Sequence, residues 1–148
     1  MKIASQTEYV SARLNDCEAV RMVCEAGFDA IDFSMFHMKN DDCPLNSDAY
    51  VEIVKEIKAI ADSYGKPFCQ AHAPFPTMKD GDEEYNKNML PKVKRSIEIA
   101  GMLGVENIVV HPGWRNRRCA ARRHRYGASA RRHQRCFLPC RFLGMKRY

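Results

Sequence analysis

Short apolar runs alternate with segments of helical periodicity through residues 1–114, and this alternation constrains the fold more than any other feature of the chain. Apolar runs typical of strands lie at residues 2–5, 29–33, 67–71 and 107–111. Between them, apolar side chains recur at spacings of three and four, as they do on one face of a helix. The resulting β-α-β-α-β-α-β order is typical of a parallel sheet joined by right-handed crossovers.

Residues suited to helix ends set the expected limits of the three helices. Asn15 can cap the first helix, with Glu18 three positions later as its capping-box partner. The second helix is expected to begin after Ser47 or Asp48, and the third near Pro91, since proline is favoured in a first turn. The apolar stripe of the third helix is expected to comprise Leu90, Val93, Ile97, Ala100 and Leu103.

The lengths of the connections indicate which face of the sheet binds ligands. Two strand-to-helix connections, at about residues 34–46 and 72–86, are long, whereas the helix-to-strand connections are short. In α/β folds the loops at the carboxyl ends of the strands build the functional site. No glycine-rich nucleotide-binding motif follows any strand, so we favour a parallel barrel over an open doubly wound sheet.

Two histidines occupy equivalent places at the ends of successive strands. His72 ends the third strand and His111 ends the fourth, and a proline follows each within two residues. At that position an imidazole can be a metal ligand, a proton shuttle or a hydrogen-bonding partner of a sugar oxygen. It can also cap the barrel core without any chemical role. Trp114 follows His111 and is interpreted either as a sugar-stacking wall or as packing.

Three other reactive side chains are given structural interpretations. Asp32 is expected to solvate a strand end, although it could also point into the barrel mouth. His37 lies in a long connection and is expected to be solvated. Cys69 alternates into a strand and is expected to be a small core residue.

The motifs around these positions resemble the xylose isomerase-like barrel superfamily. The resemblance is carried by H-A-P-F from His72, by V-V-H-P-G around His111 and by A-G-F-D-A-I-D-F-S from Ala26. That superfamily includes sugar phosphate isomerases and epimerases and DNA-repair enzymes of the endonuclease IV type. The resemblance implies a TIM barrel and metal-assisted isomerisation or epimerisation of a sugar through an enediolate, with Mn, Mg, Co or Zn as the divalent metal.

The two branches of the superfamily imply different roles for the same residues. In the isomerase and epimerase branch, His72, His111 and Trp114 would line the substrate pocket, and carboxylates from later strands would hold the metal. In the endonuclease-like branch, His72 and His111 would themselves be metal ligands. Residues 115–148 contain no aspartate or glutamate. We therefore expect a truncated half barrel of about four strands and three helices that binds no metal itself and is inactive.

The last 34 residues differ in composition from the rest of the chain. They hold 12 lysines and arginines and no acid, whereas residues 1–114 hold 12 basic and 18 acidic residues. We therefore expect two parts, the barrel half over residues 1–114 and an irregular Arg-rich tail over residues 115–148. Out-of-frame translation is the favoured interpretation of the tail, and a basic arm for nucleic acid is the alternative. A zinc knuckle is a third interpretation, and it would use Cys119, His124, Cys136 and Cys140.

The remaining expectations concern compartment and partners. The chain has no apolar run of signal-peptide or membrane-span length, so we expect a cytoplasmic protein without a membrane partner. Its seven cysteines are an odd number without CxxC spacing, which argues against a disulfide framework. A small sugar or sugar phosphate is the expected ligand, and self-association through open strand edges is expected of a half barrel.

Overall fold

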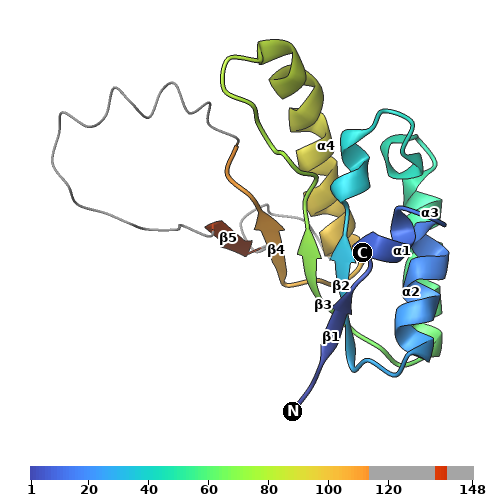
Figure 1. Cartoon of the computed structure of the whole chain (residues 1–148). Helices are drawn as coiled ribbons and strands as arrows, with labels where there is room; N and C mark the ends of the chain where they lie inside the picture. The colour runs from blue at the N-terminus through green and yellow to red at the C-terminus, as the bar shows by residue number, and fades with distance from the viewer. Residues whose placement is uncertain (114–135, 140–148) are drawn as a thin grey trace, which may run out of the picture.

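A computed structural model (Figure 1) describes residues 1–113 and 136–139 of the chain. Its five-stranded sheet has the order β1-β2-β3-β4-β5. The strands are β1 Ala4–Gln6, β2 Ala30–Ser34, β3 Phe68–His72, β4 Asn107–Val110 and β5 Cys136–Pro139. The helices are α1 Glu8–Ser11, α2 Asp16–Glu25, α3 Tyr50–Ser63 and α4 Glu83–Met102, with short 3-10 helices η1 Phe36–Lys39 and η2 Pro44–Asn46.

Strands β1 to β4 are parallel and paired in chain order, as the sequence predicts. Ala30 pairs with Ala4 of β1, and His72 of β3 pairs with Ser34 on one side and with Val109 on the other. Strand β5 pairs with β4 in the antiparallel direction. The sequence pattern does not indicate this strand, and the expectation that the β4 edge is open is wrong because β5 pairs with it.

Helices α2, α3 and α4 lie on one side of the sheet (Figure 1). An open doubly wound sheet carries helices on both faces, so this one-sided arrangement is that of a barrel. The core forms between the helices and the sheet, where Ile31 and Phe33 of β2 are buried and Phe33 packs edge-on against Phe68 at 5.9 Å between ring centroids. Asp32 lies between them in β2, and successive residues of a strand face opposite sides of the sheet.

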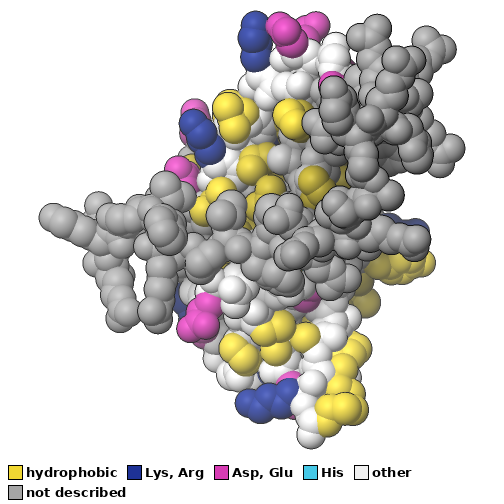
Figure 2. Space-filling model, turned by 90° about the vertical axis from the view of Figure 1, so that its left-hand side faces the viewer, with side chains coloured by type: hydrophobic (Ala, Val, Ile, Leu, Met, Phe, Trp, Pro, Cys, Tyr) yellow, Lys and Arg dark blue, Asp and Glu magenta, His cyan; other side chains and the backbone are white. Residues whose placement is uncertain are grey.

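The space-filling view shows the molecule from the side on which β4 and β5 lie (Figure 2). Hydrophobic side chains gather above and below the middle of this face, and most of the charged side chains in view lie toward its edges.

In the part of the chain that the structure describes, no helix is long and apolar enough to cross a membrane.

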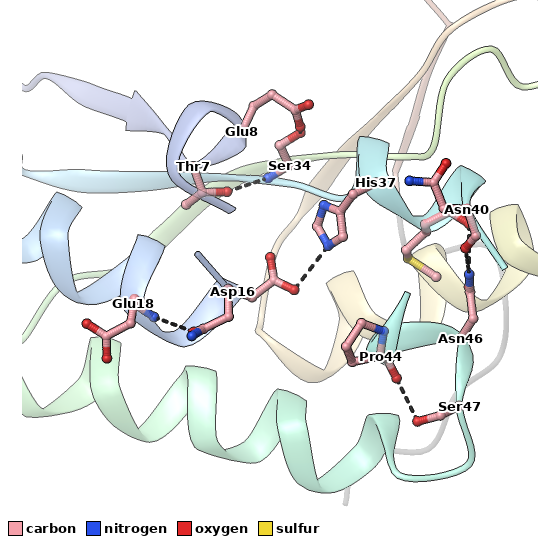
Figure 3. Close-up of polar contacts among 12 residues, drawn as sticks. Thr7, Glu8, Asp16, Glu18, Ser34, His37, Asn40, Pro44, Asn46 and Ser47 are labelled. Carbon is pink, nitrogen blue, oxygen red and sulfur yellow. Dashed lines mark hydrogen bonds and ion pairs between the residues drawn. The ribbon is translucent and has the colours of Figure 1, made fainter. Parts of the chain in front are cut away.

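The helix ends confirm one capping prediction and correct another. Asn15 caps α2, since its side chain accepts a hydrogen bond of 2.9 Å from the backbone N–H of Glu18. Helix α3 begins at Tyr50 after Ala49, without a side-chain cap. The expected cap at Ser47 or Asp48 is wrong, because the residue before the first turn is Ala49. The hydroxyl of Ser47 donates to the carbonyl of Pro44 and accepts from the backbone N–H of Ala49, which precedes the helix (Figure 3).

Helix α4 is longer than the sequence predicts. It begins at Glu83 because the side chain of Asp82 accepts a hydrogen bond from the backbone N–H of Tyr85 and caps the helix there. Pro91 therefore lies inside α4 and not in its first turn. The expectation that Leu90 is buried is also wrong, since 56% of this side chain's surface is exposed.

Candidate functional site

The carboxyl ends of β2, β3 and β4 bring a carboxylate and two imidazoles together. Asp32 lies in β2, His72 is the last residue of β3, and His111 follows directly after β4. Parallel strands that pair in register end at the same edge of the sheet, so their terminal side chains meet there. The sequence predicts this proximity for the two histidines but not for the aspartate.

Asp32 orients the ring of His72. Its Oδ1 lies 2.9 Å from the Nδ1 of His72, and its Oδ2 accepts a hydrogen bond of 3.1 Å from the side-chain amide of Gln70. A carboxylate can only accept here, so the proton of the contact sits on Nδ1 and the Nε2 of neutral His72 is left as an acceptor. The expectation that Asp32 solvates a strand end is wrong, because the side chains of Asp32 and His72 are only 17% and 13% exposed.

Four aromatic rings form a cluster at this edge. The rings of His72 and His111 are stacked, with 5.8 Å between centroids and 22° between planes. Phe36 of η1 lies edge-on to His72 at 5.5 Å, and Phe75 lies edge-on to His111 at 5.2 Å. The cluster combines apolar ring faces with imidazole nitrogens, which is the mixture found in pockets for small polar molecules with apolar faces.

His37 is buried against an acid, contrary to the sequence expectation. Its Nε2 lies 3.1 Å from the Oδ2 of Asp16, and the two side chains are 18% and 8% exposed (Figure 3). Burial alone would lower the pKa of His37, but the neighbouring Asp16, to which it is hydrogen-bonded, and Cys43 outweigh it and raise this pKa to about 10. His37 is therefore an imidazolium at neutral pH, and the pair ties η1 to the first turn of α2, one residue from Phe36.

A second polar contact joins the end of β1 to the end of β2. The hydroxyl of Thr7 accepts from the backbone N–H of Ser34 at 3.0 Å, and the hydroxyl of Ser34 donates to the carboxylate of Glu8 at 2.7 Å (Figure 3). Sequence reasoning missed Glu8 and Phe36. Phe36 could have been suspected as an aromatic residue in a long connection at the ligand-binding edge, whereas no sequence signal marks Glu8.

The glycine of the H-P-G motif is required by a close approach between two loops. A Cβ atom at Gly113 would lie 2.7 Å from the Cβ of Met78 and 2.8 Å from its carbonyl oxygen. The connection after β4 therefore packs directly on the connection between β3 and α4, beside Phe75. Trp114 lies outside the described residues, so its expected part in sugar binding stays a prediction.

Cys69 is exposed, so the expectation of a core position is wrong. The pairing of β2 with β3 shifts its register between Ile31 and Asp32, where a simple alternation of faces breaks down. The thiol of Cys69 donates to the carbonyl of Ile31 at 3.4 Å.

The residues that the structure describes do not form a metal centre. Among residues 1–113, no group of three or more histidine, cysteine, aspartate or glutamate side chains is placed to hold a metal ion. His72 already directs its Nδ1 at Asp32, and its ring is stacked on that of His111. The described part of the chain therefore does not supply the ligand set for the divalent metal that the family resemblance implies.

Comparison with known protein families identifies the family of this chain. A family model described as a xylose isomerase-like TIM barrel matches residues 20–134. The chain belongs to the xylose isomerase-like TIM barrel family. The matched region includes β2, β3 and β4 with Asp32, His72 and His111. A search of curated proteins returns no match.

Two solved structures of sugar epimerases resemble this xylose isomerase-like chain. One is the 3-keto-D-glucoside 4-epimerase YcjR from E. coli, with 26% identity and a TM-score of 0.51 over 74% of this chain. The other is a D-psicose 3-epimerase solved in the presence of D-fructose, with 21% identity and a TM-score of 0.53 over 77% of this chain. The chain spans only 37% and 39% of the lengths of these two proteins.

Proposed function

We propose that the edge formed by Asp32, His72 and His111 binds a small sugar. The observation that supports this proposal is the orientation of His72 by Asp32 at 2.9 Å beside the stacked ring of His111. A sugar presents hydroxyl groups at its edge and C–H groups on its faces. The Nε2 of neutral His72 can accept from a hydroxyl, and the rings of Phe36 and Phe75 offer apolar surface to the C–H faces.

We also propose a reaction class, and this second proposal rests on the proteins that resemble the chain. Both similar structures are sugar epimerases by name. Isomerisation and epimerisation move a proton to or from a carbon next to a carbonyl group, and an enediolate intermediate needs a base and an electrophile at its oxygens. We propose that this chain carries part of the substrate-binding surface of such an enzyme and not its electrophile.

Binding without turnover is therefore the proposed behaviour of the chain by itself. The described residues contain no metal-holding group of three ligands, and residues 115–148 contain no carboxylate side chain. His72 and Asp32 can position a hydroxyl and hold a proton at Nδ1, which is a binding function. The nearby carboxylate of Glu8 accepts from Ser34 and holds the end of β1 against β2.

The test is a titration of the full chain with D-fructose, followed by NMR of the histidine side chains. Saturable shifts of the His72 and His111 ring signals support the proposal, and His72→Ala is expected to abolish the shift of the His111 signal. Asn107→Ala is the matched control, because Asn107 is exposed at the opposite end of β4 from His111. Equal loss of binding in the two variants, or sugar binding that leaves both ring signals unmoved, would overturn the proposal.

A further inference from the structure

We propose that a cavity between α4 and the β2–α3 connection binds a small organic anion through a carboxylate or phosphate group. The cavity has a volume of about 340 Å³. Its lining residues are Asp41, Asn46, Asn88, Pro91, Lys92 and Arg95. We call it the Lys92 cavity. It shares no residue with the cluster of Asp32, His72 and His111, so it is a second site and does not depend on the proposed sugar binding.

The sequence of α4 places three nitrogen-bearing side chains on one face. Asn88, Lys92 and Arg95 follow one another at spacings of four and three, and residues at these spacings are neighbours on a helix surface. Lysine and arginine side chains offer only donors, and asparagine adds an amide donor. This face of α4 therefore presents a row of hydrogen-bond donors to the β2–α3 connection.

Lys92 is a buried cation at the wall of the cavity. Its side chain is 9% exposed, and its Nζ lies 2.9 Å from the carbonyl oxygen of Lys39 and 2.6 Å from the Oδ1 of Asp41. These are its two hydrogen bonds among the described residues, and an ammonium group carries three protons. A buried charge is costly unless it is paired, so this position favours an anion beside it.

Asp41 shows that the site accepts a carboxylate. Lys92 and Asn88 both donate to the same oxygen of Asp41, from 2.6 and 3.2 Å. Hydrogen bonds from Lys92 and Asn88 lower the pKa of Asp41, so it is an anion at neutral pH. Its side chain is nevertheless 79% exposed, so a dissolved anion can reach the pair of Lys92 and Asp41. The carboxylate of Asp41 thus occupies the proposed anion-binding position beside Lys92. A free carboxylate or phosphate would compete with it for this position.

Arg95 adds a second, fixed positive charge. Its guanidinium lies 4.6 Å from the centroid of the Tyr50 ring, and its Nη1 donates to the carbonyls of Asn46 and Ser47. These contacts hold the planar group at the cavity wall while its other nitrogens keep donors for a ligand. Two cations face one carboxylate, and the volume is near the lower end of the roughly 300–1,000 Å³ usual for small-molecule pockets. A small anion fits this charge and size.

The test titrates the full chain at low ionic strength with inorganic phosphate, with D-gluconate and with neutral D-glucose. NMR of the Asn88 side-chain amide reports on the cavity itself. We expect saturable shifts with at least one of the two anions and none with glucose, and the stronger anion identifies phosphate or carboxylate as the preferred group. Asp41→Asn removes the tethered competitor and is expected to tighten binding about fivefold.

Two lysine variants separate the cavity from general attraction to a basic chain. Lys92→Met is expected to weaken binding at least about tenfold, the size of a lost charged hydrogen bond. Lys94→Met is the matched control, because Lys94 is exposed on the same helix and does not line the cavity. Asn88→Ala serves as a second test if Lys92→Met lowers the melting temperature, since Asn88 is exposed. Its loss is expected to weaken binding about fivefold, measured by calorimetry because this variant lacks the Asn88 amide signal.

Three outcomes would overturn this proposal. Equal weakening by Lys92→Met and Lys94→Met would show diffuse attraction, to which the 12 basic residues of positions 115–148 also contribute. Unchanged affinity in Asp41→Asn would show that Asp41 does not occupy the ligand's place. Absence of a saturable shift of the Asn88 amide with either anion would show that the cavity is not an anion site.

Discussion

The Nδ1 of His72 lies 2.9 Å from the Oδ1 of Asp32, across 40 residues of sequence. The contact joins the carboxyl ends of β2 and β3 and holds the imidazole in one orientation. Because the carboxylate must accept the hydrogen bond, the acceptor nitrogen of neutral His72 is Nε2. A strand-end carboxylate therefore determines what the neighbouring histidine can offer to a ligand.

Asp32→Asn is expected to weaken D-fructose binding about tenfold, since a charge-assisted hydrogen bond is roughly twice as strong as a neutral one. Titration of the variant checks the affinity, and nitrogen chemical shifts of His72 check which ring nitrogen is protonated. Asp62→Asn is the control, because Asp62 pairs with Lys58 on the exposed surface of α3. An unchanged affinity and an unchanged His72 tautomer would contradict the orienting role of Asp32.

The pair of His37 and Asp16 is expected to make stability fall at alkaline pH. The pKa of His37 in the fold is about 10 and lies above its ordinary value of 6.5. A raised pKa in the folded state means that the full stabilisation is present below about pH 6.5 and is lost as the pH rises toward 10. The loss is expected to be on the order of a few kcal/mol, because each pKa unit corresponds to about 1.4 kcal/mol.

Urea unfolding between pH 6 and pH 10 measures this loss, in comparison with His37→Gln. The variant is expected to be less stable at pH 6 and to lose much less stability than the natural chain as the pH rises. Curves of the same slope for both proteins across this range would show that His37 is not the group responsible.

Gly113→Ala is expected to lower the free energy of unfolding by about 1–3 kcal/mol, the usual cost of overpacking. The added methyl group would lie 2.7 Å from the Cβ of Met78 and 2.8 Å from its carbonyl oxygen, and the carbonyl belongs to backbone that cannot rotate away. Thermal unfolding measures the change. Gly101→Ala is the matched control and is expected to be neutral or stabilising, because it lies in α4 and the added Cβ would meet no side chain and no other element within 4 Å.

The chain alone is expected to show no interconversion of D-fructose with its epimers or isomers in the presence of Mn²⁺, Mg²⁺, Co²⁺ or Zn²⁺. The physical reason is that the described residues hold no group of three metal ligands to supply the electrophile for an enediolate. Chromatography of long incubations provides the measurement. Metal-dependent product formation that is lost in His72→Ala would refute binding without turnover.

Local sequence patterns were sufficient to predict the order of the strands and main helices in this fold. The spacing of apolar residues predicts the four parallel strands and the helices between them, and Asn15 with Glu18 predicts the start of α2. The positions of His72 and His111 at the same edge also follow, because parallel strands paired in chain order end together. Such features depend on near neighbours in sequence, which is why they can be read from it.

The outcome is harder to predict from sequence where several local signals for a helix start or for burial compete. Pro91 is well suited to a first turn, yet Asp82 caps α4 nine positions earlier and the helix continues through the proline. Cys69 follows the alternation of a buried strand, yet the register shift between β2 and β3 leaves it exposed. In both cases other residues, and not Pro91 or Cys69 itself, decided the outcome.

The sequence by itself determined the barrel-like order of the elements and the edge at which the two histidines lie. Only the tertiary structure decided the partners of the charged side chains. Asp32 pairs with His72 and Asp16 pairs with His37 from positions 40 and 21 residues apart. The physical reason is that a periodic apolar pattern specifies which face of a helix or strand is buried. The partner of a buried charge depends instead on tertiary packing, which brings one distant side chain within hydrogen-bond distance.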